Sequence, residues 1–249
     1  MRQRLMLMGL LALALAAPTA CAQSAPANPV DPSAVQALKD MGTHLQTLKR
    51  FRATTELSGE RVLADGQKVQ HSASAQLDVA RPNRLRATMR SPRSLRVLYF
   101  DGSNVTLYTP ALKVYSTVEV NDTLAGLVER LESRFGIEVP LSDLFVWGTP
   151  AAPLDKIESA MSAGQDFIGD DLCDHYLFRQ GNVDWQICIS TGPKPLPRKL
   201  VITNRADEAR PQSVSEIAWN LNPGFNDAMF RFVPPQGATQ AQVVAPKTK

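Results

Sequence analysis

Two cysteines placed symmetrically about a turn dipeptide are the residues with the clearest chemistry. Cys173 and Cys188 lie at equal distances from Gln180-Gly181, in a segment where apolar and polar residues alternate. Alternation on both sides of a glycine-containing pair is typical of a β-hairpin, and a symmetric hairpin centred there sets the two cysteines directly opposite each other. Opposed Cβ atoms lie about 4.5–5.5 Å apart, which is close enough for a disulfide. We therefore predict a structural disulfide between Cys173 and Cys188.

The same hairpin carries the components of a metal or redox site. Thiolate and imidazole ligands together suit zinc, and His175 shares the face of the two cysteines in the predicted register. Asp174 projects to the opposite face, and the chain has no Cys-x-x-Cys motif. The disulfide is therefore favoured over a metal or redox centre, and two free thiols are expected if the register differs. No metal ligand and no cofactor is predicted.

The rest of the sequence has no evident catalytic constellation. It lacks the serine-hydrolase elbow, the glycine-rich phosphate loop and the zinc-protease helix motif, and its histidines stand apart from any nucleophile motif. The histidines are His44, His71 and His175. Four aspartates between residues 166 and 174 lack the spacing of a calcium loop and are interpreted as a solvated turn. No catalytic residue is predicted, so a non-enzymatic protein is favoured and an enzyme is left open.

The N-terminus has the pattern of an export signal. Arg2 and Arg4 precede an uncharged apolar run over residues 5–17, and small residues follow up to Ala22. This order is typical of a signal peptide, and the run is too short to span a membrane. We expect cleavage after Ala22 and a periplasmic or secreted protein. The alternative is a lipoprotein anchored through Cys21, which is disfavoured because Pro18 stands where a lipobox usually has leucine.

The charge of the exported chain limits its partners. The predicted signal peptide, residues 1–22, contains two arginines and no acidic residue, so its removal lowers the formal net charge from +3 to +1. A nearly neutral exported protein is not expected to bind nucleic acid. Arginines alternate with apolar residues on a predicted strand, and Arg84, Arg86 and Arg90 form its basic outer face. This face is interpreted as solvated, with anionic lipid head groups or an acidic partner as the alternative.

Hydrophobic periodicity divides the chain into helices and strands. A helix of about 17 residues is predicted after Asp31, a second from residue 122 to Gly136, and two short ones near residues 140 and 153. Period-two alternation over residues 51–120 and 167–232 predicts antiparallel strands. We expect one domain over residues 31–238, after a flexible leader at 23–30 and before a disordered tail at 239–249.

One face of these strands is apolar and is the best candidate for contact with a ligand. Its members come from the strands on either side of Asp101-Gly102 and from the predicted hairpin. The predicted inner wall consists of Leu98, Phe100, Val105, Leu107, Tyr176, Phe178, Trp185 and Ile187. Such a wall lines a ligand cavity or, as the alternative, belongs to an ordinary packed core.

Several motifs resemble a family of predicted periplasmic proteins of unknown function. They include Asp65-Gly66-Gln67-Lys68-Val69, Arg81-Pro82-Asn83-Arg84-Leu85-Arg86 and Cys173-Asp174-His175-Tyr176. Through that family, residues 30–238 resemble the LolA/LolB-like superfamily of lipoprotein carriers. The resemblance implies a mostly antiparallel α+β fold, in which a curved, incomplete β-barrel has helices covering its concave face. It also implies an apolar cavity that takes acyl chains.

These observations favour an exported binding protein that sequesters or carries a lipid or another apolar ligand in the cell envelope. Burial of an acyl chain contributes about 0.8 kcal/mol per methylene, so such binding needs no catalytic residue. The alternative is an envelope interaction module with a packed core, which contacts a protein partner through an edge strand or the basic face. No membrane-spanning segment is expected in the mature chain.

Overall fold

The computed structural model describes residues 30–242. The predicted signal peptide, Cys21 and residues 243–249 lie outside this range. The helical elements are α1 (Pro32–Thr47), η1 (Pro110–Leu112), α2 (Leu124–Phe135), α3 (Asp143–Val146), η2 (Leu154–Lys156) and η3 (Asp227–Phe230). The strands are β1 (Arg50–Val62), β2 (Lys68–Ala80), β3 (Arg84–Ser91), β4 (Ser94–Phe100), β5 (Asn104–Thr109), β6 (Val114–Glu119), β7 (Ser159–Ile168), β8 (Asp171–Gln180), β9 (Val183–Ser190), β10 (Pro197–Asn204), β11 (Gln212–Asn220) and β12 (Thr239–Gln240).

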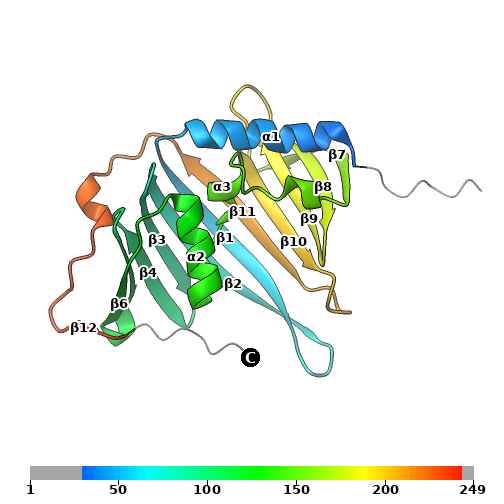
Figure 1. Ribbon diagram of the computed structural model, residues 1–249. Helices are drawn as coiled ribbons and strands as arrows, with labels where there is room; N and C mark the ends of the chain where they lie inside the picture. Colours follow the sequence, from blue (N-terminus) through cyan, green and yellow to red (C-terminus); the bar gives the residue numbers. More distant parts are fainter. Residues whose placement is uncertain (1–29, 243–249) are drawn as a thin grey trace, which may run out of the picture.

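All twelve strands belong to one open sheet with the order β12-β6-β5-β4-β3-β2-β1-β11-β10-β9-β8-β7. Neighbours are antiparallel, apart from the short parallel pair of β12 and β6. Figure 1 shows the sheet curving around α2 and α3, with α1 lying across one rim. The sheet does not close, because β7 and β12 form its two ends. This is the LolA-like half-barrel predicted from the sequence, and the prediction of its fold class is confirmed.

The two main helices begin and end where the sequence predicts. The Asp31 carboxylate accepts a hydrogen bond from the Ser33 amide at 2.8 Å, which caps α1. Thr123 caps α2 in the same way, and Gly136 ends it in the left-handed conformation with φ +60°. Each helix buries one apolar stripe. The buried residues are Ala34, Leu38, Met41 and Leu45 of α1, and Leu124, Leu127, Val128 and Leu131 of α2.

A single large hydrophobic core lies between the concave face of the sheet and the helices. It joins the buried stripes of α1 and α2 to Leu144 and Phe145 of α3 and to the inward residues of the strands, such as Phe51, Leu77 and Phe100. The roof of this core is therefore helical, and no second sheet covers it within residues 30–242. None of the helices in this range has the length and apolar character that crossing a membrane requires.

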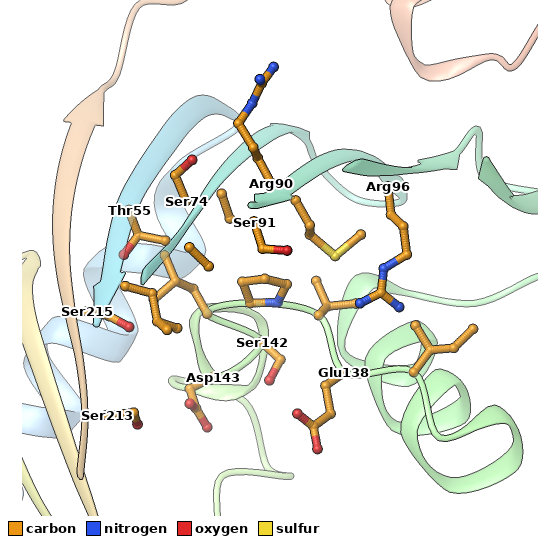
Figure 2. Close-up of a pocket in the computed structure, with 18 of the residues that line it drawn as sticks. Thr55, Ser74, Arg90, Ser91, Arg96, Glu138, Ser142, Asp143, Ser213 and Ser215 are labelled. Atoms are coloured by element: carbon orange, nitrogen blue, oxygen red, sulfur yellow. The ribbon is translucent and has the colours of Figure 1, made fainter. Parts of the chain in front are cut away.

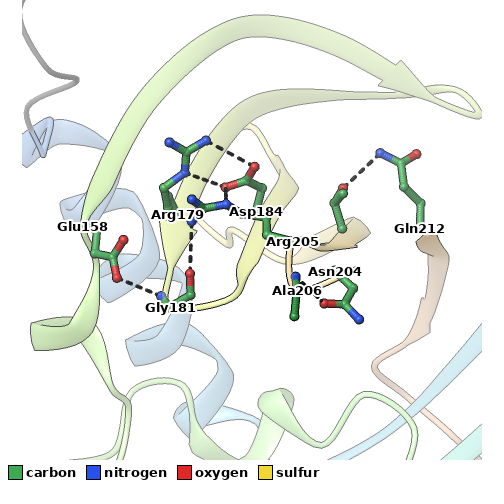
Figure 3. Close-up of polar contacts among 9 residues, drawn as sticks. Glu158, Arg179, Gly181, Asp184, Asn204, Arg205, Ala206 and Gln212 are labelled. Carbon is green, nitrogen blue, oxygen red and sulfur yellow. Dashed lines mark hydrogen bonds and ion pairs between the residues drawn. The ribbon is translucent and has the colours of Figure 1, made fainter. Parts of the chain in front are cut away.

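The hairpin of β8 and β9 differs in register from its prediction. Gln180 pairs with Val183, so Gly181 and Asn182 form the turn, and the cross-strand partner of each residue changes by two positions. Figure 3 shows the polar contacts around this turn: Arg179 and Asp184 are directly opposed and share two hydrogen bonds of 2.7 and 3.2 Å. Arg205 donates to the Gly181 carbonyl oxygen at 3.0 Å. These contacts are satisfied only in the observed register.

The shift places Cys173 opposite Ser190 and His175 opposite Cys188. The predicted direct pairing of the two cysteines is therefore wrong, and both thiols are buried and free. The predicted division of the faces does hold, because a register change of two residues leaves the alternation of inward and outward side chains unchanged. Phe178 pairs with Trp185, and their rings stack at 4.2 Å on the concave side.

The C-terminal segment is ordered further than predicted. Residues 221–242, here called the strap, include η3 and β12, although a disordered tail is predicted from residue 239. The Phe232 ring lies 4.9–5.3 Å from the rings of Tyr99, Tyr108 and Tyr115. Thr239 donates its amide to the Lys113 carbonyl oxygen at 2.9 Å. Aromatic packing and strand hydrogen bonds, which the sequence pattern does not indicate, offset the entropy lost by ordering this segment.

Candidate functional site

One opening on the concave side lies between the sheet and the connection from α2 to α3. It has a volume of about 660 Å³. Residues 136–148, here called the lid, cover it from the helical side, and β1–β4, β10 and β11 form its floor (Figure 2). Its apolar lining includes Leu57, Met89, Val128, Ile137, Val139, Leu141, Leu200 and Ile202. This space has the size of a small-molecule site.

A second, more apolar pocket of about 350 Å³ adjoins the first. It is formed by α3, the turn η2 and the inner faces of β9 and β10. Its lining includes Val146, Trp147, Leu154, Ile157, Val183 and Trp185. Both pockets share Asp143, Leu200 and Ile202, so they meet beneath α3. The two together are called the trough below.

The polar groups of the trough are concentrated in the larger pocket. Thr55, Ser213 and Ser215 line the floor, and Ser142 and Glu138 line the lid. Figure 2 shows Arg96 extending toward the lid, whereas Arg90 points away from the pocket. The smaller pocket has no arginine or lysine in its lining. The trough therefore has an apolar end near the two tryptophans and a polar end near Arg96.

Asp143 is the titratable group at the junction of the two pockets. Its carboxylate faces the open space of the trough, although protein surrounds it on most sides. Burial, with a smaller contribution from the negative charge of Glu132, raises the pKa of Asp143. At a given pH, a carboxyl with a raised pKa is protonated more often than one with the ordinary value. It can then donate a hydrogen bond to a ligand.

Two contacts with α1 hold the lid in place. Gln46 donates its side-chain amide to the Trp147 carbonyl oxygen at 2.6 Å. The backbones of Gly42 and Gly148 also meet: a Cβ atom added at Gly148 would lie 2.2 Å from the Gly42 carbonyl oxygen. Gly148 has φ +78°, which favours glycine for a second reason. The lid can approach α1 closely because neither residue has a side chain.

The predicted inner-wall residues are divided between cavities and core. Trp185 lines the trough. Leu98, Val105 and Leu107 line a separate space of about 210 Å³ between β4, β5, β6 and α2. The remaining four, Phe100, Tyr176, Phe178 and Ile187, pack in or against the hydrophobic core. Their role in ligand binding stays a prediction.

The sequence interpretation missed most of the trough itself. Leu200 and Ile202 alternate along β10 and share its concave face, so period-two alternation could have found them. The lid residues Ser142 and Asp143 lie where the short helix α3 begins, in the connection between α2 and β7. No sequence signal locates such a connection over a cavity.

The three predicted basic residues differ in their surroundings. The Arg84 guanidinium forms an ion pair with Asp227 of the strap. The Arg86 guanidinium lies 5.4 Å from the centre of the Tyr99 ring, in a cation–π contact. Arg90 is exposed. Of these three, Arg90 is the one without an ion pair or cation–π contact within residues 30–242.

A family model described as "Predicted periplasmic protein (DUF2092)" matches residues 34–244. The chain belongs to this family. Its description agrees with the export that the N-terminal sequence predicts, whereas the signal peptide and its cleavage remain predictions. Among curated proteins, none matches the chain.

Several solved structures resemble the fold at low sequence identity. An uncharacterised conserved protein from Thermus thermophilus has a TM-score of 0.50 and 12% identity, covering 84% of this chain and 99% of its own. The lipoprotein LppX from Mycobacterium tuberculosis has a TM-score of 0.49 and 11% identity, covering 78% and 97%. A LolA superfamily protein from Nitrosomonas europaea has a TM-score of 0.39 and 9% identity, covering 80% and 97%. At these identities the likeness concerns the fold.

Proposed function

We propose that this DUF2092 protein holds a lipid or another apolar molecule in the trough, within the cell envelope. The observation that carries the proposal is the junction of the two pockets at Asp143, Leu200 and Ile202. Together they provide an apolar end and a polar end beneath one lid. A long amphipathic molecule matches that distribution better than a compact polar metabolite does.

The arrangement implies one orientation of the ligand. The acyl chain lies against Trp147, Trp185 and Ile157, and the polar group lies near Arg96 and the floor hydroxyls. Each buried methylene contributes about 0.8 kcal/mol. Removing two methylenes from the bound part of the chain therefore weakens binding by about 1.6 kcal/mol, which is roughly 15-fold.

The test combines extraction with a blocking variant. Native mass spectrometry of the exported protein, and lipid analysis of its organic extract, should find a bound lipid. Ile202→Trp, which fills the junction of the pockets, should abolish displacement of a fluorescent fatty acid. Val69→Trp is the matched control, because Val69 is exposed near the tip of β2 and lines neither pocket. Equal binding by both variants, or no effect of chain length, would contradict the proposal.

A second candidate function is supported by the outer edge of the sheet at β7, which within residues 30–242 pairs only at Ala160. β7 ends the sheet, and it exposes Phe167 and Met161, which retain 66% and 43% of their surface. Such an edge can receive a strand from another protein. A photo-crosslinking residue at position 167 should then capture an envelope protein in cells, whereas one at position 69 should not. Identical results at both positions would count against this role.

A further inference from the structure

Three potential metal ligands meet on the convex face of the sheet, on the side opposite the trough. Asp166, His175 and Cys188 each offer one ligand atom, and these atoms all lie within 4.8 Å of one another. The residues come from the three successive strands β7, β8 and β9. Each contributes a different ligand type: a carboxylate oxygen, an imidazole nitrogen and a sulfur.

A β-bulge brings Asp166 into this group. Ala160 and Ser162 pair with Phe178 and Tyr176 on the concave side, but the register shifts between Ser162 and Gly164. Beyond the shift, Asp166 pairs with Cys173 on the convex side. Without the extra residue, simple alternation would turn Asp166 toward the concave face. The bulge therefore moves a carboxylate next to the thiol and the imidazole.

The observed hairpin register makes Cys188 available to such a site. Cys188 is opposite His175, and Cys173 is opposite Ser190, so the two cysteines are diagonal neighbours. Diagonal positions are about 7–8 Å apart, whereas disulfides need Cα atoms within about 4.4–6.8 Å. The geometry favours contact of the Cys188 thiol with His175 over a bond to Cys173.

A neighbouring amide can orient the imidazole. His175 Nε2 lies 3.1 Å from Gln186 Oε1. When this amide oxygen accepts the Nε2 proton, the Nδ1 atom keeps its lone pair for a cation. Histidine ligands of metal ions usually have such an outer hydrogen-bond partner. Gln186 is therefore assigned a positioning role.

Burial and charge also suit a cation here. Cys188 is 2% exposed and His175 is half-buried, while the exposed Asp166 leaves the solvent side open. The two cations on the adjoining strand β10 are already engaged: Arg198 pairs with Asp171 at 2.7 Å and Lys199 with Glu216 at 3.6 Å. Their charges therefore oppose a bound cation less than free side chains would.

We propose that Asp166, His175 and Cys188 bind one thiophilic divalent cation of the zinc class. Nitrogen, sulfur and carboxylate oxygen are the ligands of protein zinc sites, and three of them leave one tetrahedral position for water. Binding releases the Cys188 thiol proton and forms the sulfur–metal bond. Without a bound ion, the three side chains remain neighbours on the convex face of the sheet.

The test is a zinc titration of the reduced, purified chain against a chelating indicator, repeated with cobalt to record thiolate-to-metal absorption. Cys21→Ala is present throughout, so the only thiols are in the hairpin. We expect one ion per chain, cobalt absorption, and loss of both in Cys188→Ser and His175→Gln. Cys173→Ser is the matched control: it removes the other buried thiol and should retain binding. Gln186→Leu should weaken binding by about 10–100-fold.

Three outcomes would overturn the proposal. The first is the absence of a one-to-one complex in the reduced protein. The second is equal loss in Cys173→Ser and Cys188→Ser, which would assign binding to the thiol pair and not to the three-strand cluster. The third is unchanged affinity in His175→Gln and Asp166→Asn. Circular dichroism of each variant shows whether the fold is intact.

Discussion

Replacement of Gly148 by alanine tests how closely the lid is held against α1. The new Cβ atom would lie 2.2 Å from the Gly42 carbonyl oxygen, and both partners are backbone, so the lid or α1 must move. Such overpacking costs about 1–3 kcal/mol. The positive φ of +78° adds about 1–2 kcal/mol for a residue with a side chain. We expect a total loss of about 2–5 kcal/mol in the free energy of unfolding.

Gly164→Ala is the matched control. Gly164 has φ +91°, but nothing lies within 4 Å of its added Cβ atom. This variant should lose only the conformational part, about 1–2 kcal/mol. Urea unfolding measures both losses, and the difference between the variants isolates the contact of the lid with α1. In thermal unfolding this difference corresponds to about 2–12 °C in Tm for a domain of this size. If Gly148→Ala is no less stable than Gly164→Ala, the proposed backbone contact is refuted.

Three further predictions concern the strap, a thiol and the lid. Phe232→Ala should destabilise the protein by about 1–3 kcal/mol through loss of its aromatic contacts, whereas Val233→Ala, at a position 75% exposed, should be nearly neutral in urea unfolding. Burial, and to a lesser extent the neighbouring thiol of Cys173, raises the pKa of Cys188 to about 11. At pH 8 the alkylation of Cys188 should therefore be far slower in the metal-free native protein than in urea. Equal alkylation rates in the two conditions would contradict this. Because the pKa of Asp143 is higher in the folded protein than in the unfolded chain, ionisation of this carboxyl disfavours folding. The free energy of unfolding should therefore fall as the pH rises above the pKa that Asp143 has in the unfolded chain. Asp143→Asn should therefore be more stable than the unmodified protein at pH 7 and equally stable at pH 3, which parallel urea titrations measure.

The fold was predictable because its main signals are local. The cap and apolar stripe of α1, the glycine that ends α2 and the alternation along the strands each follow from neighbouring residues. The resemblance to the LolA-like superfamily then supplies the half-barrel arrangement. The concave position of the helices follows from their apolar stripes, which have no other surface to cover.

The register of the β8–β9 hairpin depended on information that symmetry about one dipeptide does not contain. A register change of two residues leaves the alternation unchanged, so the faces were predicted correctly while the cysteine pairing was wrong. The opposite charges of Arg179 and Asp184 indicate the observed register, because these residues oppose each other only when Gly181 and Asn182 form the turn. Cross-strand charge pairs are therefore a useful additional signal.

The trough and the strap depend on contacts between distant segments. Asp143 and Leu200 line the same cavity although nearly sixty residues separate them in the sequence. Phe232 contacts three tyrosines of a sheet region that is more than one hundred residues away in sequence. Periodicity indicates which face of an element is apolar, but it does not indicate which distant segment covers that face.

The two ends of the sheet have different capacities for assembly. At one end lies β12, which has only two residues; at the other end, the outer edge of β7 pairs only at Ala160 among residues 30–242. A filament requires each subunit to offer two complementary edges, and only one long edge is present among residues 30–242. Copies of this chain that associate through their sheets would therefore join β7 to β7 in a two-fold pair, which leaves no edge for a third copy.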